Sequence, residues 1–322
     1  MLTKVLDGVK TVAIGGHIRP DGDCVGSCLG MYLYLTKVYP EVKVDVYLQR
    51  FSKTFGFLQR IEDIKHEVTG EKEYDLFISL DCGDRERLGF TLPLFDKAKR
   101  TLCIDHHESN NAFADVNYIY PEASSTAELV YDLLDKDEID TGIAQAIYLG
   151  IVHDTGVFQY SNVAPSTFQA AAFLITKEID APRIISETFY AKTYAQNQIL
   201  GRTLLESFLL LDGRVIAGSV SRRVMDFYEV NPGDFEGIVS QMRVTEGVEV
   251  AIFMYELEPG NFKVSLRSKD IVDVNRIAAY FGGGGHKKAA GFNMAGTAHD
   301  ITNNVTKFVA EQLKELEGNA RD

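Results

Sequence analysis

Acidic and histidine side chains cluster at four places in the sequence, three of them directly after a predicted strand and one after a predicted helix. These places are His17-Ile-Arg-Pro-Asp21-Gly-Asp23, Asp81, Asp105-His106-His107 and Asp154. Carboxylates and imidazoles in this proportion suit divalent ions such as Mn²⁺, with Mg²⁺ or Co²⁺ as alternatives. Without cations, so many carboxylates would repel one another and raise their own pKa values. Their combination therefore predicts a centre that holds two divalent metal ions.

Each place taken alone has a simpler interpretation. The segment from His17 to Asp23 could be a polar turn that caps the next helix, and Asp81 could be a solvated loop acid. A cysteine-based zinc site is a competing idea, because Cys24, Cys82 and Cys103 lie beside these motifs. No pair of them has the spacing of a zinc knuckle, and small buried thiols explain them better.

A second kind of chemistry is indicated by the glycine run Gly282–Gly285, which precedes His286, Lys287 and Lys288. Glycines allow the backbone to approach an anion closely with its N–H groups pointing inward. A flexible hinge is the alternative, but the three basic residues favour an anion site. Arg267, on a predicted strand, could bind a phosphate through two parallel hydrogen bonds, or could be an ordinary surface ion-pair partner.

The elements that must position these residues follow an alternating pattern in the first half of the chain. Strands are predicted at Thr11–Ile14, Lys43–Leu48, Asp75–Leu80 and Thr101–Ile104, with helical segments between them. Strands that alternate with helices are typical of a parallel sheet. Ligands of such sheets lie beyond the carboxyl ends of the strands, so the polar segments that end these strands should meet.

The pattern changes in the second half. Apolar residues between Lys192 and Leu211 have helical spacing, which predicts a connecting helix. After Asp212-Gly213, strands and a hairpin turn predict a further sheet. We therefore expect an α/β protein in which a parallel-sheet domain with flanking helices (residues 1–190) is joined by a helical linker (191–212) to a smaller α/β domain (213–322).

Composition limits the possible functions. The 322 residues suffice for two domains, and a net charge of −13 argues against stable binding to a nucleic-acid duplex, which depends on phosphate neutralisation. Short nucleotides remain possible if metal ions supply positive charge. Four cysteines do not make a disulfide framework. No apolar stretch approaches the roughly 20 residues that span a membrane, and the start lacks the apolar centre of a signal peptide, so we expect a cytoplasmic protein.

The motifs HIRPDGD, LDCGD, IDHH and HDTG resemble, in order and spacing, the four motifs of the DHH phosphoesterase family. In the second half, Ser265-Leu-Arg-Ser268 and the segment from Phe281 to Phe292 resemble the substrate-binding motifs of the DHHA subfamily 1 domain. The chain closely resembles the compact bifunctional oligoribonucleases of this family that also dephosphorylate 3′-phosphoadenosine 5′-phosphate (pAp).

The resemblance implies a role for each matching residue. His17 and Asp21 would bind one metal ion, Asp23, His106 and Asp154 the other, and Asp81 would bridge them. His107 would face the substrate phosphate, and Asp105 would orient a ligand histidine. The residues that would bind substrate are Arg267, Ser268, Gly283, Gly284, Gly285 and His286.

The function implied is hydrolysis of very short RNA to mononucleotides and of pAp to AMP and phosphate. Its partners would be short RNA and nucleotides, and a homodimer is possible. Alternatives are a phosphodiesterase for cyclic-di-AMP or linear dinucleotides, and, outside enzymes, a nucleotide-binding sensor. The family's pyrophosphatases are a weaker match, because the glycine-rich second domain is typical of the nucleotide-acting branch. The intact motifs argue against a sensor.

Overall fold

The structure is a computed structural model that describes the backbone of residues 2–319 and the side chains of residues 2–315. It divides into two compact units, residues 1–191 and 192–322. No helix in the described part of the chain has the length and apolar character needed to cross a membrane.

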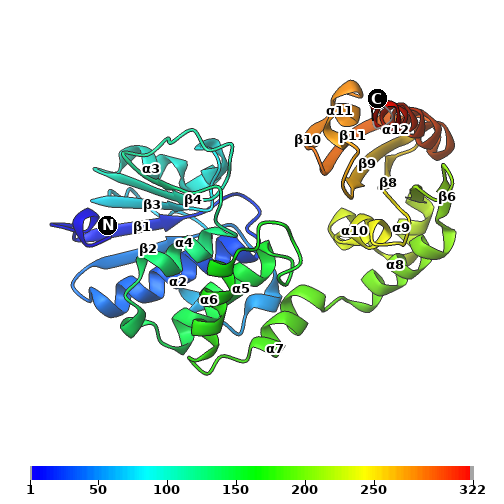
Figure 1. Cartoon of the computed structure of the whole chain (residues 1–322). Coiled ribbons are helices and arrows are strands. Elements are labelled where there is room, and N and C mark those ends of the chain that lie inside the picture. Colours follow the sequence, from blue (N-terminus) through cyan, green and yellow to red (C-terminus); the bar gives the residue numbers. More distant parts are fainter. Residues whose placement is uncertain (1, 320–322) are drawn as a thin grey trace. The chain divides into compact units, whose positions relative to one another are not determined.

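The first unit is built on a five-stranded sheet in which all neighbouring strands are parallel, in the order β2-β1-β3-β4-β5 (Figure 1). The strands are β1 (Thr11–Gly15), β2 (Lys43–Tyr47), β3 (Leu76–Leu80), β4 (Thr101–Asp105) and β5 (Val116–Ile119). The parallel sheet and its first four strands were predicted and are confirmed. The edge strand β5 was missed, since its side chains are half-buried or exposed and give no apolar run.

Helices cover both faces of this sheet. Helices α2 (Gly22–Val38), α4 (Thr126–Leu133), α5 (Thr141–Asp154) and α6 (Pro165–Ile175) lie on one side in Figure 1, and α3 (Leu92–Lys97) lies on the other. Successive side chains of β1 point to opposite faces of the sheet, as this arrangement requires. Val12 and Ile14 pack into the core on the α2 side, and Ala13 packs into the core on the α3 side. Two short α-helices, α1 (Leu2–Val5) and α7 (Ala181–Ile184), also belong to this unit.

Close helix packing fixes the positions of α2, α4 and α5. A Cβ atom on Gly26 of α2 would lie 2.4 Å from the Ala146 carbonyl oxygen of α5, so only glycine allows this approach. A Cβ on Gly150 of α5 would lie 2.5 Å from Ala127 Cβ of α4 and 2.8 Å from Asp23 Oδ1. The ends of these helices that carry acidic residues are therefore held close together.

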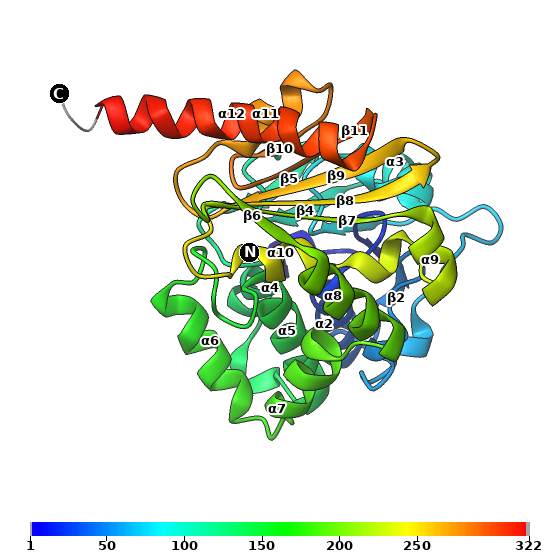
Figure 2. The same cartoon turned by 90° about the vertical axis from the view of Figure 1, so that its right-hand side faces the viewer.

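The second unit contains a six-stranded sheet in the order β10-β11-β9-β8-β7-β6, in which only the β7–β8 pair is parallel. Its strands are β6 (Phe208–Leu210), β7 (Val215–Val220), β8 (Val250–Glu258), β9 (Asn261–Ser268), β10 (Gly284–His286) and β11 (Ala289–Ala295). Helices α11 (Val274–Tyr280) and α12 (Ala298–Asn319) cover one face, and α8 (Tyr194–Glu206), α9 (Arg222–Tyr228) and α10 (Ile238–Arg243) cover the other (Figure 2).

The linker helix expected over residues 191–212 is shorter than predicted. Helix α8 begins after the Thr193 cap and ends at Glu206. Phe208–Leu210 then pair with Ala217, Ile216 and Val215 of β7. A short apolar segment such as this can form either a helix or a strand, and here it forms a strand because it pairs with β7.

Candidate metal centre

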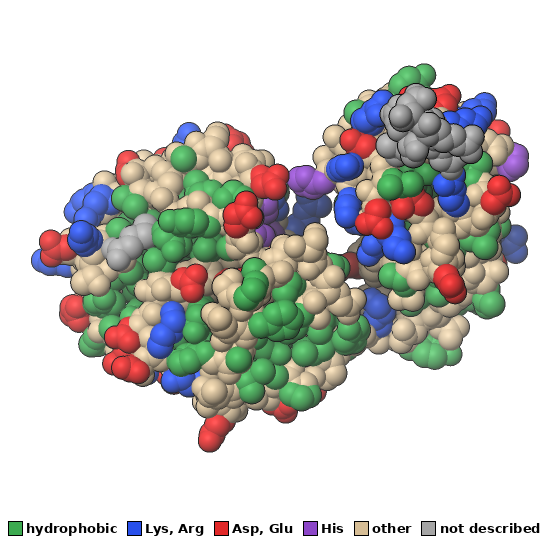
Figure 3. Space-filling view, in the orientation of Figure 1, with side chains coloured by type: hydrophobic (Ala, Val, Ile, Leu, Met, Phe, Trp, Pro, Cys, Tyr) green, Lys and Arg blue, Asp and Glu red, His purple; other side chains and the backbone are tan. Residues whose placement is uncertain are grey.

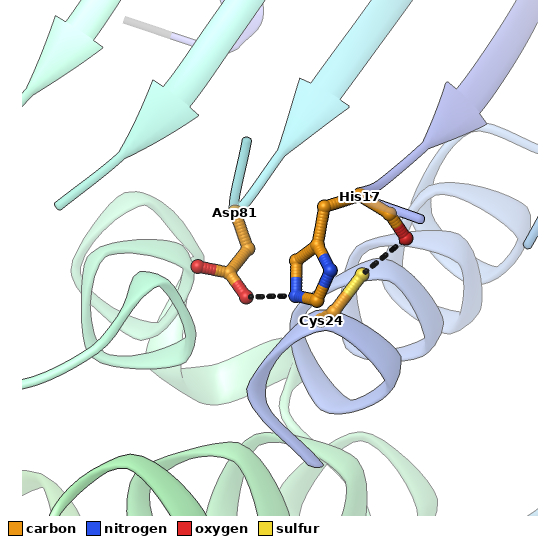
Figure 4. A group of neighbouring side chains, drawn as sticks. All are labelled: His17, Cys24 and Asp81. Atoms are coloured by element: carbon orange, nitrogen blue, oxygen red, sulfur yellow. Dashed lines mark hydrogen bonds and ion pairs between the residues drawn. The ribbon is translucent and has the colours of Figure 1, made fainter. Parts of the chain in front are cut away.

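The carboxyl ends of β1, β3 and β4 bring the predicted metal ligands together. His17 follows β1 and Asp81 follows β3, and Figure 4 shows their side chains pointing toward each other. His17 Nε2 lies 3.4 Å from Asp81 Oδ2 and 3.6 Å from Asp21 Oδ2. These three side chains, which we call the first ligand group, lie together, and their role as ligands of one ion stays a prediction.

A second ligand group lies on the other side of Asp81. His106 Nε2 is 3.7 Å from Asp81 Oδ1 and 3.4 Å from Asp154 Oδ2. Ligand atoms of Asp23, His106 and Asp154 all lie within 4.8 Å of one another. The two oxygens of Asp81 thus face different groups, Oδ2 toward His17 and Oδ1 toward His106. This is the geometry required of a carboxylate that bridges two ions.

The backbone of Asp81 has an uncommon conformation, with φ of 56°, in the left-handed region. Asp and Asn adopt this region more easily than most other residues. The turn allows the chain to leave β3 while its side chain, 3% exposed, stays between the two groups.

Asp23 is held by the first turn of α4. Its oxygens accept hydrogen bonds from the backbone N–H groups of Thr126 (2.7 Å) and Ala127 (2.9 Å). Helix α4 begins there because Ser125 caps it by accepting from Glu128 N. Thr126 also donates from Oγ1 to Asp81 Oδ1 (3.2 Å). The first turn of α4 therefore orients the carboxylates of both Asp23 and Asp81. The positive end of a helix suits these negative groups.

Hydrogen bonds orient the histidines. His17 Nδ1 lies 2.8 Å from the Ile18 carbonyl oxygen and donates to it, so Nε2, which faces the carboxylates, is the atom that would bind a metal ion once its own proton leaves. His107 Nδ1 lies 2.8 Å from Asp105 Oδ1. Asp105 was expected to orient a ligand histidine, but the structure pairs it with His107. The other Asp105 oxygen accepts from Asn110 Nδ2 (2.7 Å), a contact that no sequence signal indicated.

The electrostatics of the centre show an excess of buried negative charge. Burial raises the pKa of Asp23 well above its ordinary value, and Asp81 and Asp154 raise it further. Burial also raises the pKa of Asp154 to about 6, with a contribution from Asp81 and an opposing effect of His106. Burial acts to lower the pKa of His17, but hydrogen bonds with Asp21 and Asp81 raise it overall. Protons retained on these carboxyl groups reduce the repulsion between them in the metal-free protein. Divalent cations would displace these protons and neutralise the carboxylates instead.

Cys24 lies closer to the first ligand group than the sequence suggested. Its Sγ is within 4.8 Å of ligand atoms of His17 and Asp81, and it lies 4.0 Å from the His17 carbonyl oxygen (Figure 4). All four cysteines are free and buried, which confirms that they form no disulfide framework. Burial raises the pKa of the Cys24 thiol, so Cys24 is a neutral neighbour of His17.

In the second unit, the strand register aligns two of the predicted substrate-binding residues. Ala289 of β11 pairs with Arg267 of β9 on one side and with His286 of β10 on the other. Directly paired residues of antiparallel strands point to the same face, so Arg267 and His286 share one face of the sheet. Ser268 lies on the opposite face, is 2% exposed, and has its Oγ 3.4 Å from the Lys287 carbonyl oxygen, to which it donates.

The glycine run forms a tight hairpin with β11 instead of an open loop. A Cβ on Gly283 would lie 2.2 Å from the Gly291 carbonyl oxygen, and one on Gly285 would lie 2.4 Å from that of Ala289. Gly284 has open space around it, with its nearest neighbour at 4.0 Å. Close packing therefore explains Gly283 and Gly285, a φ of 77° favours glycine at Gly282, and Gly284 is the glycine of strand β10 with open space around it.

Comparisons with known proteins agree with the motifs. Residues 11–151 match the family model for the DHH family, N-terminal domain, and residues 213–318 match the DHHA1 domain. The chain is 28% identical over 318 residues to the bifunctional oligoribonuclease and PAP phosphatase NrnA of Thermus thermophilus, covering 97% of this chain and 94% of that protein. It is 25% identical over 295 residues to the Bacillus subtilis protein of the same name, covering 90% and 91%.

A solved structure has the same fold. The crystal structure of an exopolyphosphatase-related protein from Bacteroides fragilis matches with a TM-score of 0.86 and 25% identity, covering 100% of this chain and 96% of that chain.

Proposed function

The chain belongs to the DHH phosphoesterase family, and we propose that it hydrolyses very short RNA to mononucleotides and pAp to AMP and phosphate with two divalent ions. The observation that carries this proposal is the Asp81 carboxylate, whose two oxygens face two separate groups of ligand atoms. The relatives named as bifunctional oligoribonuclease and PAP phosphatase support the choice of substrates.

The proposed mechanism assigns a role to each group of residues. His17 and Asp21 would hold one ion, Asp23, His106 and Asp154 the other, and Asp81 both. When bound, two such ions supply a nucleophile at neutral pH and neutralise charge on the phosphate. Mn²⁺ suits the mixture of carboxylates and imidazoles best, with Mg²⁺ or Co²⁺ as substitutes.

His107 would act on the substrate phosphate. The hydrogen bond to Asp105 raises the pKa of His107, so the imidazolium form is favoured and Nε2 can donate to a phosphate oxygen. In the second unit, Arg267 and His286 would bind the phosphate of the terminal nucleotide, with the backbone of Gly284 open beside them.

Charge supports a short substrate. Long strands need a continuous basic groove, whereas this chain carries a net charge of −13. On the face seen in Figure 3, acidic side chains lie between the basic ones on each unit. Short RNA and nucleotides are also consistent with a cytoplasmic location, which is part of the proposal.

The test measures phosphate release from pAp and mononucleotide release from a dinucleotide, with Mn²⁺ and with EDTA. The Asp81→Asn variant keeps a residue that tolerates the left-handed backbone but removes the charge, so it should lose both activities and bind fewer than two ions. Hydrolysis of a cyclic dinucleotide alone would favour the cyclic-dinucleotide alternative. Near-normal turnover of Asp81→Asn with two bound ions would contradict the bridging role.

A further inference from the structure

Three arginines of the first unit have acidic partners, which Arg87 lacks among the described residues. Arg60, Arg85 and Arg183 pair with Asp63, Asp96 and Glu187. Arg87 is half-buried, and within the described part of the chain its guanidinium has no hydrogen-bond or ion-pair partner. A partly desolvated cation without a partner costs free energy, so its retention here needs a reason.

The backbone around Arg87 fixes it beside the candidate metal centre. Its N–H donates to Asp84 Oδ1 (2.9 Å), and its carbonyl oxygen accepts from Ile18 N (2.8 Å), the residue after His17. Leu88, the next residue, is 1% exposed in the core on the α3 side of the sheet. The Arg87 backbone is therefore anchored on both sides, next to the motif that carries the first ligand group.

The charge of Arg87 also reaches the motif that carries the second ligand group. Gly83, which precedes Asp84, packs against His107, with a Cβ position 3.2 Å from the His107 ring. The pKa of His107 is raised by its hydrogen bond to Asp105, and the positive charge of Arg87 acts against this rise. The guanidinium thus lies within electrostatic range of the histidine that would face the substrate phosphate.

We propose that Arg87 binds the phosphate group that is hydrolysed, adding a permanent positive charge beside the imidazolium of His107. This inference rests on the proposed function and adds a substrate contact to it. A guanidinium presents N–H groups in a planar fork that matches two phosphate oxygens, and its charge does not depend on pH in the working range. A bound phosphate would give Arg87 the partner that it otherwise lacks.

The experiment compares Arg87→Ala and Arg87→Lys with Arg85→Ala. Arg85 is the matched control because it lies two residues away, and its guanidinium pairs with Asp96 at 2.5 Å. Loss of a charge-assisted hydrogen bond should lower kcat/KM of Arg87→Ala roughly tenfold to a hundredfold on pAp and on a dinucleotide. Arg87→Lys should recover only part of this loss, because an ammonium lacks the fork. Arg85→Ala should stay within about twofold, since exposed ion pairs contribute little.

Two further measurements distinguish binding from a structural role. Guanidinium ion added to Arg87→Ala should restore part of its activity, whereas ammonium ion should not. Calorimetric titration with inorganic phosphate in Mg²⁺ buffer should show weaker binding to Arg87→Ala than to the unchanged protein. If Arg87→Ala does not fold, the same comparisons are made with Arg87→Lys and Arg87→Gln.

The outcomes separate the two proposals. If the unchanged protein hydrolyses neither substrate, the proposed function fails, and the phosphate titration still decides the role of Arg87. Equal phosphate affinity of the folded Arg87 variants and the unchanged protein would overturn the inference. A loss of kcat/KM that guanidinium does not rescue, with unchanged phosphate affinity, would show that Arg87 only supports the fold.

Discussion

Replacing Gly150 by alanine should disturb the candidate metal centre through Asp23. The new Cβ would lie 2.5 Å from Ala127 Cβ and 2.8 Å from Asp23 Oδ1, both far below van der Waals contact. Ala127 and Asp23 are themselves joined by a hydrogen bond of 2.9 Å. The methyl group would therefore push against the first turn of α4 and against the carboxylate that this turn holds.

The magnitude follows from two opposing effects on the free energy of unfolding. Alanine is favoured over glycine inside a helix by about 0.8–1 kcal/mol. Forcing a methyl group into a packed interior costs about 1–3 kcal/mol, and the neighbours here are a helix start and a buried carboxylate, which cannot swing away. Because these neighbours cannot move, we expect a packing cost in the upper half of this range, about 2–3 kcal/mol, and hence a net loss of about 1–2 kcal/mol. The shift of Asp23 should also weaken the ion that it holds by roughly tenfold or more.

Urea unfolding in EDTA measures the first effect, and the number of tightly bound Mn²⁺ ions per chain, from the paramagnetic signal of free Mn²⁺, measures the second. Gly201→Ala in α8 is the control, because nothing lies within 4 Å of its Cβ position. The control should gain up to about 1 kcal/mol and keep its metal content. Unchanged stability and two tightly bound ions in Gly150→Ala would refute the close contact between α5 and Asp23.

Three other predictions concern pH and substrate. The pKa of Asp154 is raised to about 6, so between pH 4 and 6 the folded metal-free protein keeps a proton on Asp154. In the unfolded chain this carboxyl has its ordinary pKa of 3.8 and has already lost the proton. The free energy of unfolding in EDTA should therefore fall as pH rises from 4 to 6. Asp154→Asn should flatten this fall, and a melting temperature that rises over this range in the unchanged protein would contradict it. Asp105→Asn should lower the pKa of His107 and move the alkaline limit of kcat to lower pH, and an unmoved limit would show that protonated His107 is not required. A dinucleotide should be hydrolysed faster than a 20-mer with little dependence on salt, whereas faster, steeply salt-dependent turnover of the 20-mer would indicate a groove for long strands.

The sheet and the grouping of the metal ligands could be predicted because they depend on local patterns. Apolar β-branched runs predict strands, and parallel strands place their carboxyl ends on one edge. His17, Asp81 and His106 follow such strands and lie together in the structure. Their role as ligands stays a prediction.

The remaining features depend on contacts that no local pattern records. Asp105 could have paired with either neighbouring histidine, and side-chain packing decides for His107. Ser268 is a case in which a local rule was available, because residues next to each other on a strand point to opposite faces and Arg267 already faces outward. Arg87 has no motif of its own, and its lack of a partner among the described residues is visible only in the fold.

The left-handed backbone at residue 81 limits which amino acids can stand there. Glycine and asparagine accept this conformation but lack the negative charge, and glutamate has the charge but fits the conformation less well and carries its carboxylate one methylene further out. Aspartate alone meets both requirements. No single substitution at position 81 therefore keeps both properties: each one loses either the left-handed turn or the negative charge that faces the two ligand groups.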